Sequence, residues 1–375
     1  MGVSRKVRIA IAAWHLRDFN VGLGRYGRAL IEAIGRVDRE NHYEILMPDD
    51  SCRFPARPNM RYRLIRFPIF KRRFWEQVAP LLSGSHDLLH LPYDSCVAWK
   101  RGKLVVTIHD VKPLLFGSPS QGRNVNSMVE RFLVRDKWGR IDHVLTDSHC
   151  SRRDIVGRLG VREERVTVVY PGVEPERFCP AKSGPVGLGS GRPYVLCVAG
   201  ADPTKNVGAL VEAFAKLPLP IRGAHDLVLA GDFRRRVDLH EQVKRTGIEK
   251  QTVFTGVVSD DRLIELYQQA VLFVFPSLYE GFGFPVLEAM ACGCPVISSN
   301  ASSLPEVAGD AALLVDPTDV EGLSGLMKRV LTDGELRRDL RARGLDRAAE
   351  FSWDRTARET IAVYRRVVGE VGGEA

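Results

Sequence analysis

Residues 276–306, PSLYEGFGFPVLEAMACGCPVISSNASSLPE, hold the strongest structural pattern in the chain. The apolar run LFVFPS at 272–277 leads into this stretch as a strand, and Glu280 follows in a glycine-rich turn. Pro285 suits the first position of a helix, so we expect 286–291 to be helical. The N-terminus of that helix would attract anions, because its N–H groups and its dipole are positive there. The stretch therefore predicts a strand–turn–helix unit with an anion site at the end of the strand.

The same alternation of apolar strands and helices fills both halves of the chain. The expected strands are 7–13, 43–47, 87–91, 103–109, 143–147 and 166–170, then 194–200, 226–232, 253–257, 272–277, 295–299 and 312–316. Near-continuous apolar strands between helices indicate parallel sheets covered on both faces. The fold class is therefore α/β, with two doubly wound, Rossmann-like domains. Ligands of such folds bind at the carboxyl ends of the strands, so we expect the functional site in the cleft between the domains.

The segment 181–193, AKSGPVGLGSGRP, is rich in glycine and proline and is the expected linker. We place the N-terminal domain at 1–180 and the C-terminal domain at 194–355. The remaining residues, 356–375, are expected to form a helix that packs back on the N-terminal domain.

Composition excludes several classes of protein. The 375 residues carry a formal net charge of +8, and the seven cysteines show no C-x-x-C pair or zinc spacing. No run of apolar residues is long enough to span a membrane, and we expect a cytoplasmic protein. Much of the positive charge lies at 61–74, RYRLIRFPIFKRRF. This stretch is either a solvated face beside an edge strand or a peripheral contact with the inner, anionic membrane face. No nucleic-acid-binding module is evident.

The residues VGLGRYGRA at 21–29 contain the glycine pattern of dinucleotide-binding folds, with Gly22, Gly24 and Gly27 at G-x-G-x-x-G spacing. In those folds the glycines follow the first strand directly, whereas here residues 14–21 intervene. The acids at 49–50 could serve as the ribose-binding residue, which keeps an NAD- or FAD-dependent oxidoreductase as an alternative. The eight residues between the strand and Gly22 favour a phosphate other than that of a dinucleotide as the ligand of these glycines.

The spacing Glu280-x7-Glu288 within EGFGFPVLEAMACGCPVI resembles the signature of the retaining glycosyltransferases of family four, which have the GT-B fold. The resemblance covers nearly the whole chain. It includes VGLGRYGRAL at 21–30, TIHD at 107–110, TDSHCSRRDI at 146–155, VVYPGV at 168–173, VAGADPTKN at 198–206 and FSWDRTARE at 351–359.

The resemblance implies an acceptor-side N-terminal domain, a nucleotide-sugar-binding C-terminal domain and a role for each matched residue. Glu280 would accept hydrogen bonds from hydroxyls of the donor sugar, and Glu288 would bind the ribose. Lys205 would neutralise the leaving diphosphate, and His109 would contact the transferred sugar near the acceptor. The residues placed around the sugar and diphosphate are Gly281, Phe282, Gly283, Phe284 and Leu287, with Gly22 and Gly24 closing over the diphosphate from the other domain.

One departure from the family's pattern concerns the diphosphate. Many relatives carry a basic residue at the position of Ala201 or Thr204, so Lys205 is the evident cation here. A second cation would come from the arginines at 234–236 or from Arg25. If neither source supplies a second cation, the alternative to an enzyme is a protein that binds a nucleotide sugar without catalysis.

The implied reaction is transfer of a hexose from a nucleotide diphosphate sugar to a glycan or lipid-linked acceptor. GDP-mannose is the first choice of donor, followed by UDP-glucose and a deoxysugar nucleotide. The chain has no D-x-D motif and no evident covalent nucleophile, so we expect a metal-independent, front-face displacement with retention and no cofactor.

Overall fold

The computed structural model describes residues 6–17, 22–52, 54–66, 72–97, 100–116, 139–181 and 191–369. The chain divides into two compact units. Unit 1 comprises 1–172 and 352–375, and unit 2 comprises 173–351. The sequence-based boundaries at 180 and 355 lie near this division. Most of the expected linker, 181–193, falls outside the described residues.

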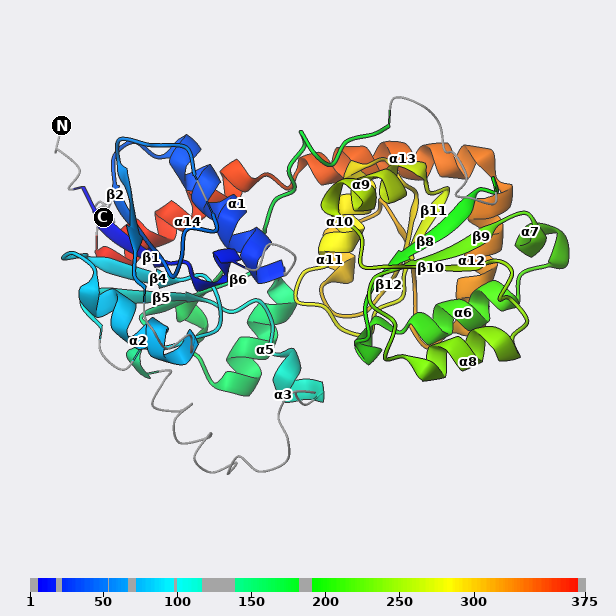
Figure 1. Ribbon diagram of the computed structural model, residues 1–375, viewed down its shortest axis with the longest axis horizontal. Helices are drawn as coiled ribbons and strands as arrows, with labels where there is room; N and C mark the ends of the chain where they lie inside the picture. Colours follow the sequence, from blue (N-terminus) through cyan, green and yellow to red (C-terminus); the bar gives the residue numbers. More distant parts are fainter. Residues whose placement is uncertain are drawn as a thin grey trace. The chain divides into compact units, whose positions relative to one another are not determined.

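Unit 1 is built on a seven-stranded parallel sheet in the order β3-β2-β1-β4-β5-β6-β7. The strands are β1 (Arg8–Ala12), β2 (His42–Met47), β3 (Met60–Leu64), β4 (Leu88–Leu91), β5 (Lys103–Thr107), β6 (His143–Thr146) and β7 (Val166–Val168). The helices are η1 (Trp14–Arg17), α1 (Gly22–Val37), α2 (Arg72–Leu82), α3 (Lys112–Phe116), α5 (His149–Leu159), η2 (Glu163–Arg165) and α14 (Trp353–Val368). The C-terminal helix α14 packs against α1 (Figure 1), and Arg36 of α1 pairs with Asp354 of α14 at 2.8 Å.

Unit 2 has a six-stranded parallel sheet in the order β10-β9-β8-β11-β12-β13. The strands are β8 (Tyr194–Val198), β9 (Asp226–Ala230), β10 (Thr252–Gly256), β11 (Leu272–Phe275), β12 (Val296–Ser299) and β13 (Leu313–Val315). The helices are η3 (Pro203–Lys205), α6 (Val207–Ala215), α7 (Leu219–Gly223), α8 (Val237–Arg245), α9 (Asp260–Gln269), α10 (Phe284–Ala291), α11 (Leu304–Ala308), α12 (Val320–Thr332) and α13 (Gly334–Ala349). Helices cover both faces of the sheet (Figure 1), which confirms the doubly wound α/β fold.

Each sheet has a point at which the strand order reverses. In unit 2, β8 pairs with β9 on one side and with β11 on the other. In unit 1, β1 pairs with β2 on one side and with β4 on the other. Ligands of open α/β sheets bind beyond the carboxyl ends of the strands near such a point. The loops after β8 and β11 are therefore where the fold favours a ligand in unit 2.

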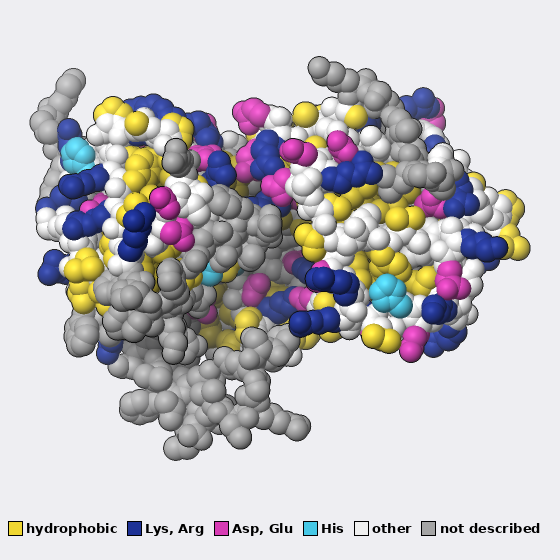
Figure 2. All heavy atoms as spheres, viewed as in Figure 1, with side chains coloured by type: hydrophobic (Ala, Val, Ile, Leu, Met, Phe, Trp, Pro, Cys, Tyr) yellow, Lys and Arg dark blue, Asp and Glu magenta, His cyan; other side chains and the backbone are white. Residues whose placement is uncertain are grey.

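The basic stretch 61–74 is described only in part. Residues 61–64 belong to β3, the edge strand of the unit 1 sheet, while 67–71 lie outside the described residues. Arg63 pairs with Glu44 at 3.1 Å and Arg66 with Asp50 at 3.3 Å. On the face shown in Figure 2, Lys and Arg side chains are interspersed with Asp and Glu. Contact of this stretch with a membrane stays a prediction. Among the described residues, no helix is both long and apolar enough to cross a membrane.

Candidate active site

Lys205 and Glu280 meet at the strand-order reversal of unit 2. Lys205 ends the short helix η3 after β8, and Glu280 lies in the turn after the neighbouring strand β11. The Lys205 Nζ atom is 2.6 Å from Glu280 Oε1, and the two side chains are 21% and 12% exposed. The Ser277 hydroxyl donates to the same carboxylate oxygen at 2.7 Å. Two residues separated by 75 positions in sequence thus form a half-buried ion pair at the expected place.

Hydrogen bonds to backbone carbonyl oxygens connect the two loops that carry this ion pair. Asn206 adopts a left-handed conformation with φ 54°, and its side-chain amide donates to the carbonyl oxygens of Pro276 and Pro317 at 3.1 and 2.7 Å. The backbone N–H of Leu278 donates to the Thr204 carbonyl at 2.8 Å. These bonds fix the loop after β8 against the loop after β11, so the ion pair is held by the fold rather than by its own attraction.

Two serines after β12 hold the main chain of Glu280. Ser302, which has φ 54°, accepts from the Glu280 N–H at 2.8 Å and donates to the Glu280 carbonyl at 2.7 Å. The Ser303 hydroxyl lies 2.9 Å from the Glu280 carbonyl oxygen and 2.8 Å from that of Phe282. The sequence analysis assigned no role to either serine, since serine in a loop carries no pattern that marks such a contact.

Helix α10 begins directly after this turn. Gly283 caps it with φ 116°, a conformation that favours glycine, and Pro285 lies in the first turn. The side chains of Phe282 and Leu287 are buried, whereas Phe284 is half-buried. The segment Gly281–Phe284 can therefore offer a ligand its peptide groups, in the position predicted for an anion site.

Glu288 lies on α10 with its side chain turned into the protein. The residue is 3% exposed, and the Tyr267 hydroxyl of α9 donates to Glu288 Oε2 at 3.1 Å. The sequence analysis did not identify Tyr267. A ribose bound by Glu288 would have to approach a carboxylate that already has a protein partner, so Tyr267 would help to orient it.

Neither position that is basic in many relatives supplies a cation here, because they hold Ala201 and Thr204. The Thr204 hydroxyl and N–H donate to the Asp202 carboxylate, at 2.9 and 3.0 Å, so Asp202 caps η3 and Thr204 lies within it. Arg236 follows β9, the neighbour of β8, and its side chain is only 15% exposed. Its guanidinium pairs with Asp238 at 2.8 Å, while its Nη1 atom is buried with no hydrogen-bond partner among the described residues.

The neighbouring Arg234 is also held by an aspartate, since Asp232 binds it through two hydrogen bonds of 2.9 and 2.7 Å, but its side chain is 85% exposed. Arg235 is exposed as well, so Arg236 is the least exposed arginine of 234–236. Arg25, the other candidate, belongs to unit 1.

His109 of unit 1 lies after β5, between groups from the two neighbouring strands. Its Nδ1 is 2.6 Å from Asp147 Oδ2, after β6, and its Nε2 is 3.2 Å from the Pro92 carbonyl oxygen, after β4. The Asp147 carboxylate and the Pro92 carbonyl are both hydrogen-bond acceptors, so their placement favours the protonated form of the ring. Burial alone would lower the pKa of His109, but the charge and hydrogen bond of Asp147, together with the Pro92 carbonyl, raise it.

Asp147 was not singled out from the sequence, which placed it as the last residue of the expected strand 143–147; in the structure it directly follows β6. It is 2% exposed, and its Oδ1 atom is buried without a hydrogen-bond partner among the described residues. Tyr26 of α1 covers the His109 ring edge-on, with the ring centres 4.6 Å apart. The neighbouring Asp110 accepts from the Lys112 N–H at 2.9 Å and so caps α3. His109 is thus held rigidly by its surroundings.

The glycine pattern of unit 1 lies at the start of α1. The helix begins at Gly22, so Gly22 and Gly24 lie in its first turn. A Cβ atom added to Gly22 would meet nothing within 4 Å. Neither packing against the described residues nor a positive φ requires glycine at this position.

Comparison with known proteins identifies the family of the chain. Residues 22–177 match the model described as Glycosyltransferase Family 4, and residues 181–347 match the one described as Glycosyl transferases group 1. O-antigen chain mannosyltransferase B of Escherichia coli is 34% identical over 270 residues, which cover 70% of each chain. The serotype-specific mannosyltransferase WbdA of Escherichia coli is 32% identical over 296 residues, 74% of this chain and 35% of that protein. Sucrose-phosphate synthase of Thermosynechococcus elongatus superposes with a TM-score of 0.73 and 21% identity, covering 98% of this chain and 100% of that one.

The fold and site therefore define a GT-B glycosyltransferase, an enzyme that takes its sugar from a nucleotide sugar. The chain belongs to glycosyltransferase family 4 and resembles its mannosyltransferases. This membership excludes the dinucleotide oxidoreductase, to which only the glycine pattern at 22–27 pointed. The roles of the individual residues are proposals.

Proposed function

We propose that this enzyme transfers mannose from GDP-mannose to a glycan or lipid-linked acceptor, with retention of configuration and without a metal ion. The observation that carries the proposal is the ion pair of Lys205 and Glu280, 2.6 Å apart beside the N-terminus of α10. The choice of mannose rests on the relatives named mannosyltransferases.

The donor diphosphate is bound by cations of the protein. Lys205 lies next to the peptide groups that precede α10, and Arg236 follows the adjacent strand with an unpaired, buried Nη1 atom. Cations and N–H groups fixed in advance stabilise a departing diphosphate without reorganisation, at roughly 3–4 kcal/mol for each donor. Two such cations would take the part that a metal ion plays in other transferases.

Glu280 acts as an acceptor for sugar hydroxyls rather than as a nucleophile. Its Oε1 atom is already engaged by Lys205 and Ser277, which leaves Oε2 for the donor sugar. When the diphosphate binds, Lys205 exchanges part of its contact with Glu280 for a phosphate oxygen. The carboxylate released by this exchange then accepts a sugar hydroxyl.

The transfer step needs no covalent intermediate. The acceptor oxygen forms its bond to the anomeric carbon on the face from which the diphosphate departs, so configuration is retained. The acceptor proton moves to the phosphate oxygen whose bond to that carbon breaks. His109 contacts the transferred sugar by turning its Nε2–H from the Pro92 carbonyl, which costs one hydrogen bond of 3.2 Å.

The proposal is tested by identifying the nucleotide that binds and the anomeric configuration of the product. Thermal unfolding with GDP, UDP, GDP-mannose and UDP-glucose identifies the base, because a ligand at 100 times its Kd stabilises the protein by about 2.7 kcal/mol. NMR of the product assigns the anomeric configuration, and turnover is repeated with excess chelator. Stabilisation by UDP-glucose alone, an inverted product or a loss of activity with chelator would each contradict the corresponding part.

The two arginines of the loop after β9 provide a matched pair of variants. Arg236→Met should weaken binding of GDP and slow transfer by about tenfold or more, because a charge-assisted hydrogen bond is lost. Arg234→Met removes an exposed guanidinium two residues away and should leave both quantities unchanged. Equal effects of the two substitutions would remove Arg236 from the diphosphate site.

We expect the enzyme to act in the cytoplasm, at or near the inner membrane face if its acceptor is lipid-linked. The basic stretch 61–74 is the candidate for that contact, and cosedimentation with anionic vesicles tests it.

A further inference from the structure

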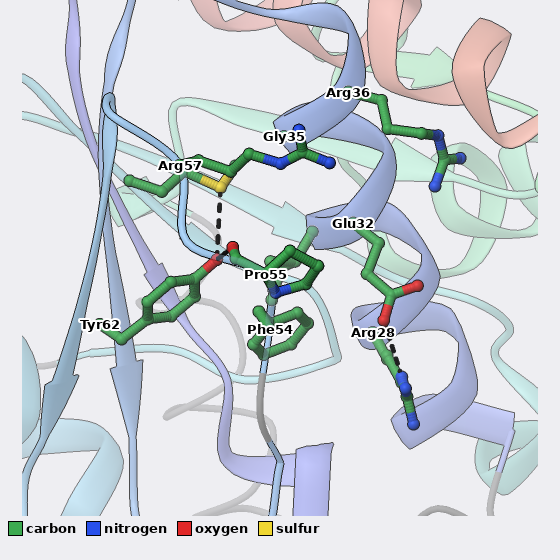
Figure 3. Close-up of a pocket in the computed structure, with 10 residues that line it drawn as sticks. Arg28, Glu32, Gly35, Arg36, Phe54, Pro55, Arg57 and Tyr62 are labelled. Carbon is green, nitrogen blue, oxygen red and sulfur yellow. Dashed lines mark hydrogen bonds and ion pairs between the residues drawn. The ribbon is translucent and has the colours of Figure 1, made fainter.

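Unit 1 contains a second pocket, on the flank of α1 and outside the site described above. One wall is a face of α1 that carries Arg28, Glu32 and Arg36, and the other is the segment from Phe54 to Tyr62 (Figure 3). Its volume of about 490 Å³ lies within the range of small-molecule sites.

The pocket lies toward the far end of α1 from Gly22. With a rise of about 1.5 Å per residue, Arg28 is about 9 Å and Arg36 about 21 Å along the helix from Gly22. On the opposite wall, Met60 is the first residue of β3, whereas His109 follows the carboxyl end of β5. The pocket therefore belongs to the amino-terminal edge of the sheet and is separate from the His109 site.

The side of the pocket formed by 54–62 is apolar and aromatic. The rings of Phe54 and Tyr62 are stacked, with centroids 5.4 Å apart and an interplanar angle of 2°. The Met60 thioether is 8% exposed and packs against Gly35 of α1, where an added Cβ would lie 3.1 Å from the sulfur. A flat apolar surface of this kind suits the C–H face of a sugar ring better than a fully solvated ion.

The rim of the pocket is positively charged. Arg28 pairs with Glu32 at 2.9 Å, and Arg36 pairs with Asp354 at 2.8 Å. Arg57 has no carboxylate partner among the described residues, and its guanidinium extends from the loop toward α1 (Figure 3). A guanidinium without a carboxylate partner among the described residues favours phosphate or carboxylate, which it can bind through two parallel hydrogen bonds.

We propose that this pocket binds a negatively charged sugar unit of the acceptor, one that bears a phosphate or a carboxylate. The ring of that unit packs on the aromatic wall, its anionic group binds Arg57, and its hydroxyls donate to Glu32. This inference rests on the proposed transfer to a glycan acceptor and adds a second point of attachment. An acceptor of several units would be held at both places, so the pocket would favour extended, anionic acceptors over short ones.

Binding measured with the donor site already filled tests the proposal. With the full chain saturated by its nucleoside diphosphate, a hexose phosphate, a hexuronic acid, the neutral hexose and inorganic phosphate are titrated by ligand-observed NMR or calorimetry. At least one anionic sugar should bind about tenfold more tightly than both the neutral hexose and inorganic phosphate, and the tighter of the two anionic sugars identifies the charged group. If the neutral sugar or phosphate alone binds as tightly as both anionic sugars, or nothing binds, the proposal is wrong.

The variants Arg57→Gln and Phe54→Ala should each remove most of this preference. Arg61→Gln is the matched control, because Arg61 lies exposed on β3 and does not line the pocket. Stabilisation by the nucleotide should be unchanged in all three variants, which separates failure of this inference from failure of the proposed function. A loss in Arg61→Gln equal to that in Arg57→Gln would overturn the assignment of the pocket.

Discussion

Replacing Lys205 by methionine separates the two roles of the ion pair with Glu280. The substitution keeps the length of the side chain and removes its charge. If Lys205 stabilises the departing diphosphate, transfer should slow by roughly 100- to 1,000-fold, the cost of one preorganised donor at about 3–4 kcal/mol. Donor affinity should fall less, because the additional negative charge on the leaving diphosphate develops only as its bond to the sugar breaks.

The cost in stability can be worked from the geometry of the pair. An exposed ion pair contributes about 0–1 kcal/mol, and breaking a fully buried one costs about 3–5 kcal/mol. The side chains of Lys205 and Glu280 are 21% and 12% exposed, and Glu280 keeps its hydrogen bond from Ser277. We therefore expect a loss of about 1–2 kcal/mol, which lowers the melting temperature of a domain of this size by roughly 2–8 °C.

The assay measures nucleoside diphosphate released with and without acceptor, and thermal unfolding in parallel. Glu280→Gln and the double variant complete a cycle with Lys205→Met. The double variant should recover part of the lost stability, because neither charge is then unpaired, but none of the lost activity. Turnover of Lys205→Met within a few-fold of the unchanged enzyme, or recovery of activity in the double variant, would refute the reasoning.

Three further substitutions test the remaining contacts of the site. Asp147→Asn should lower the pKa of His109. The stabilisation by the protonated ring is lost as pH rises through this pKa, so both stability and activity should decline at a lower pH than in the unchanged enzyme. Unfolding measured as a function of pH and pH–rate profiles follow these two quantities. Gly22→Ala should leave the melting temperature unchanged or raise it, since the added methyl group meets no described atom within 4 Å. The same substitution should raise KM for the donor. A raised melting temperature with an unchanged KM would argue against ligand approach at Gly22. Tyr267→Phe should weaken donor binding by up to about tenfold through loss of the hydrogen bond to Glu288, and calorimetry with the nucleoside diphosphate and with the free base would show whether the effect requires the ribose.

The sequence was sufficient to predict the architecture because its strands are almost entirely apolar. β11, for example, is buried at all four positions, and the glycine turn and Pro285 after it predict the start of α10. Gly22 and Gly24 lie in the first turn of α1, although glycine lowers helix propensity. Tertiary context overrides that preference.

The site was predictable only where a residue type and its spacing carry the chemistry. Lys205 and Glu280 were expected from the resemblance to glycosyltransferase family four, and the structure brings them together. The residues that position the site are different. Ser302 reaches the main chain of Glu280 because its backbone has a left-handed conformation, and Asp147 reaches His109 because β6 is the neighbour of β5 in the sheet. Neither property is visible in a local pattern, because both depend on which strands become neighbours.

The crossing of the chain between the units has a consequence for synthesis on the ribosome. Unit 2 is continuous in sequence, whereas unit 1 needs α14, in which Tyr364 lies within hydrogen-bonding distance of His90 at 2.6 Å in the core. At the crossing, Gly172 lies so close to the backbone at Trp353 that an added Cβ would be 2.2 Å from its nitrogen. Unit 2 can therefore complete its fold while unit 1 still waits for its last helix. A chain that ends before residue 353 would contain all of unit 2 but would leave the unit 1 sheet without α14.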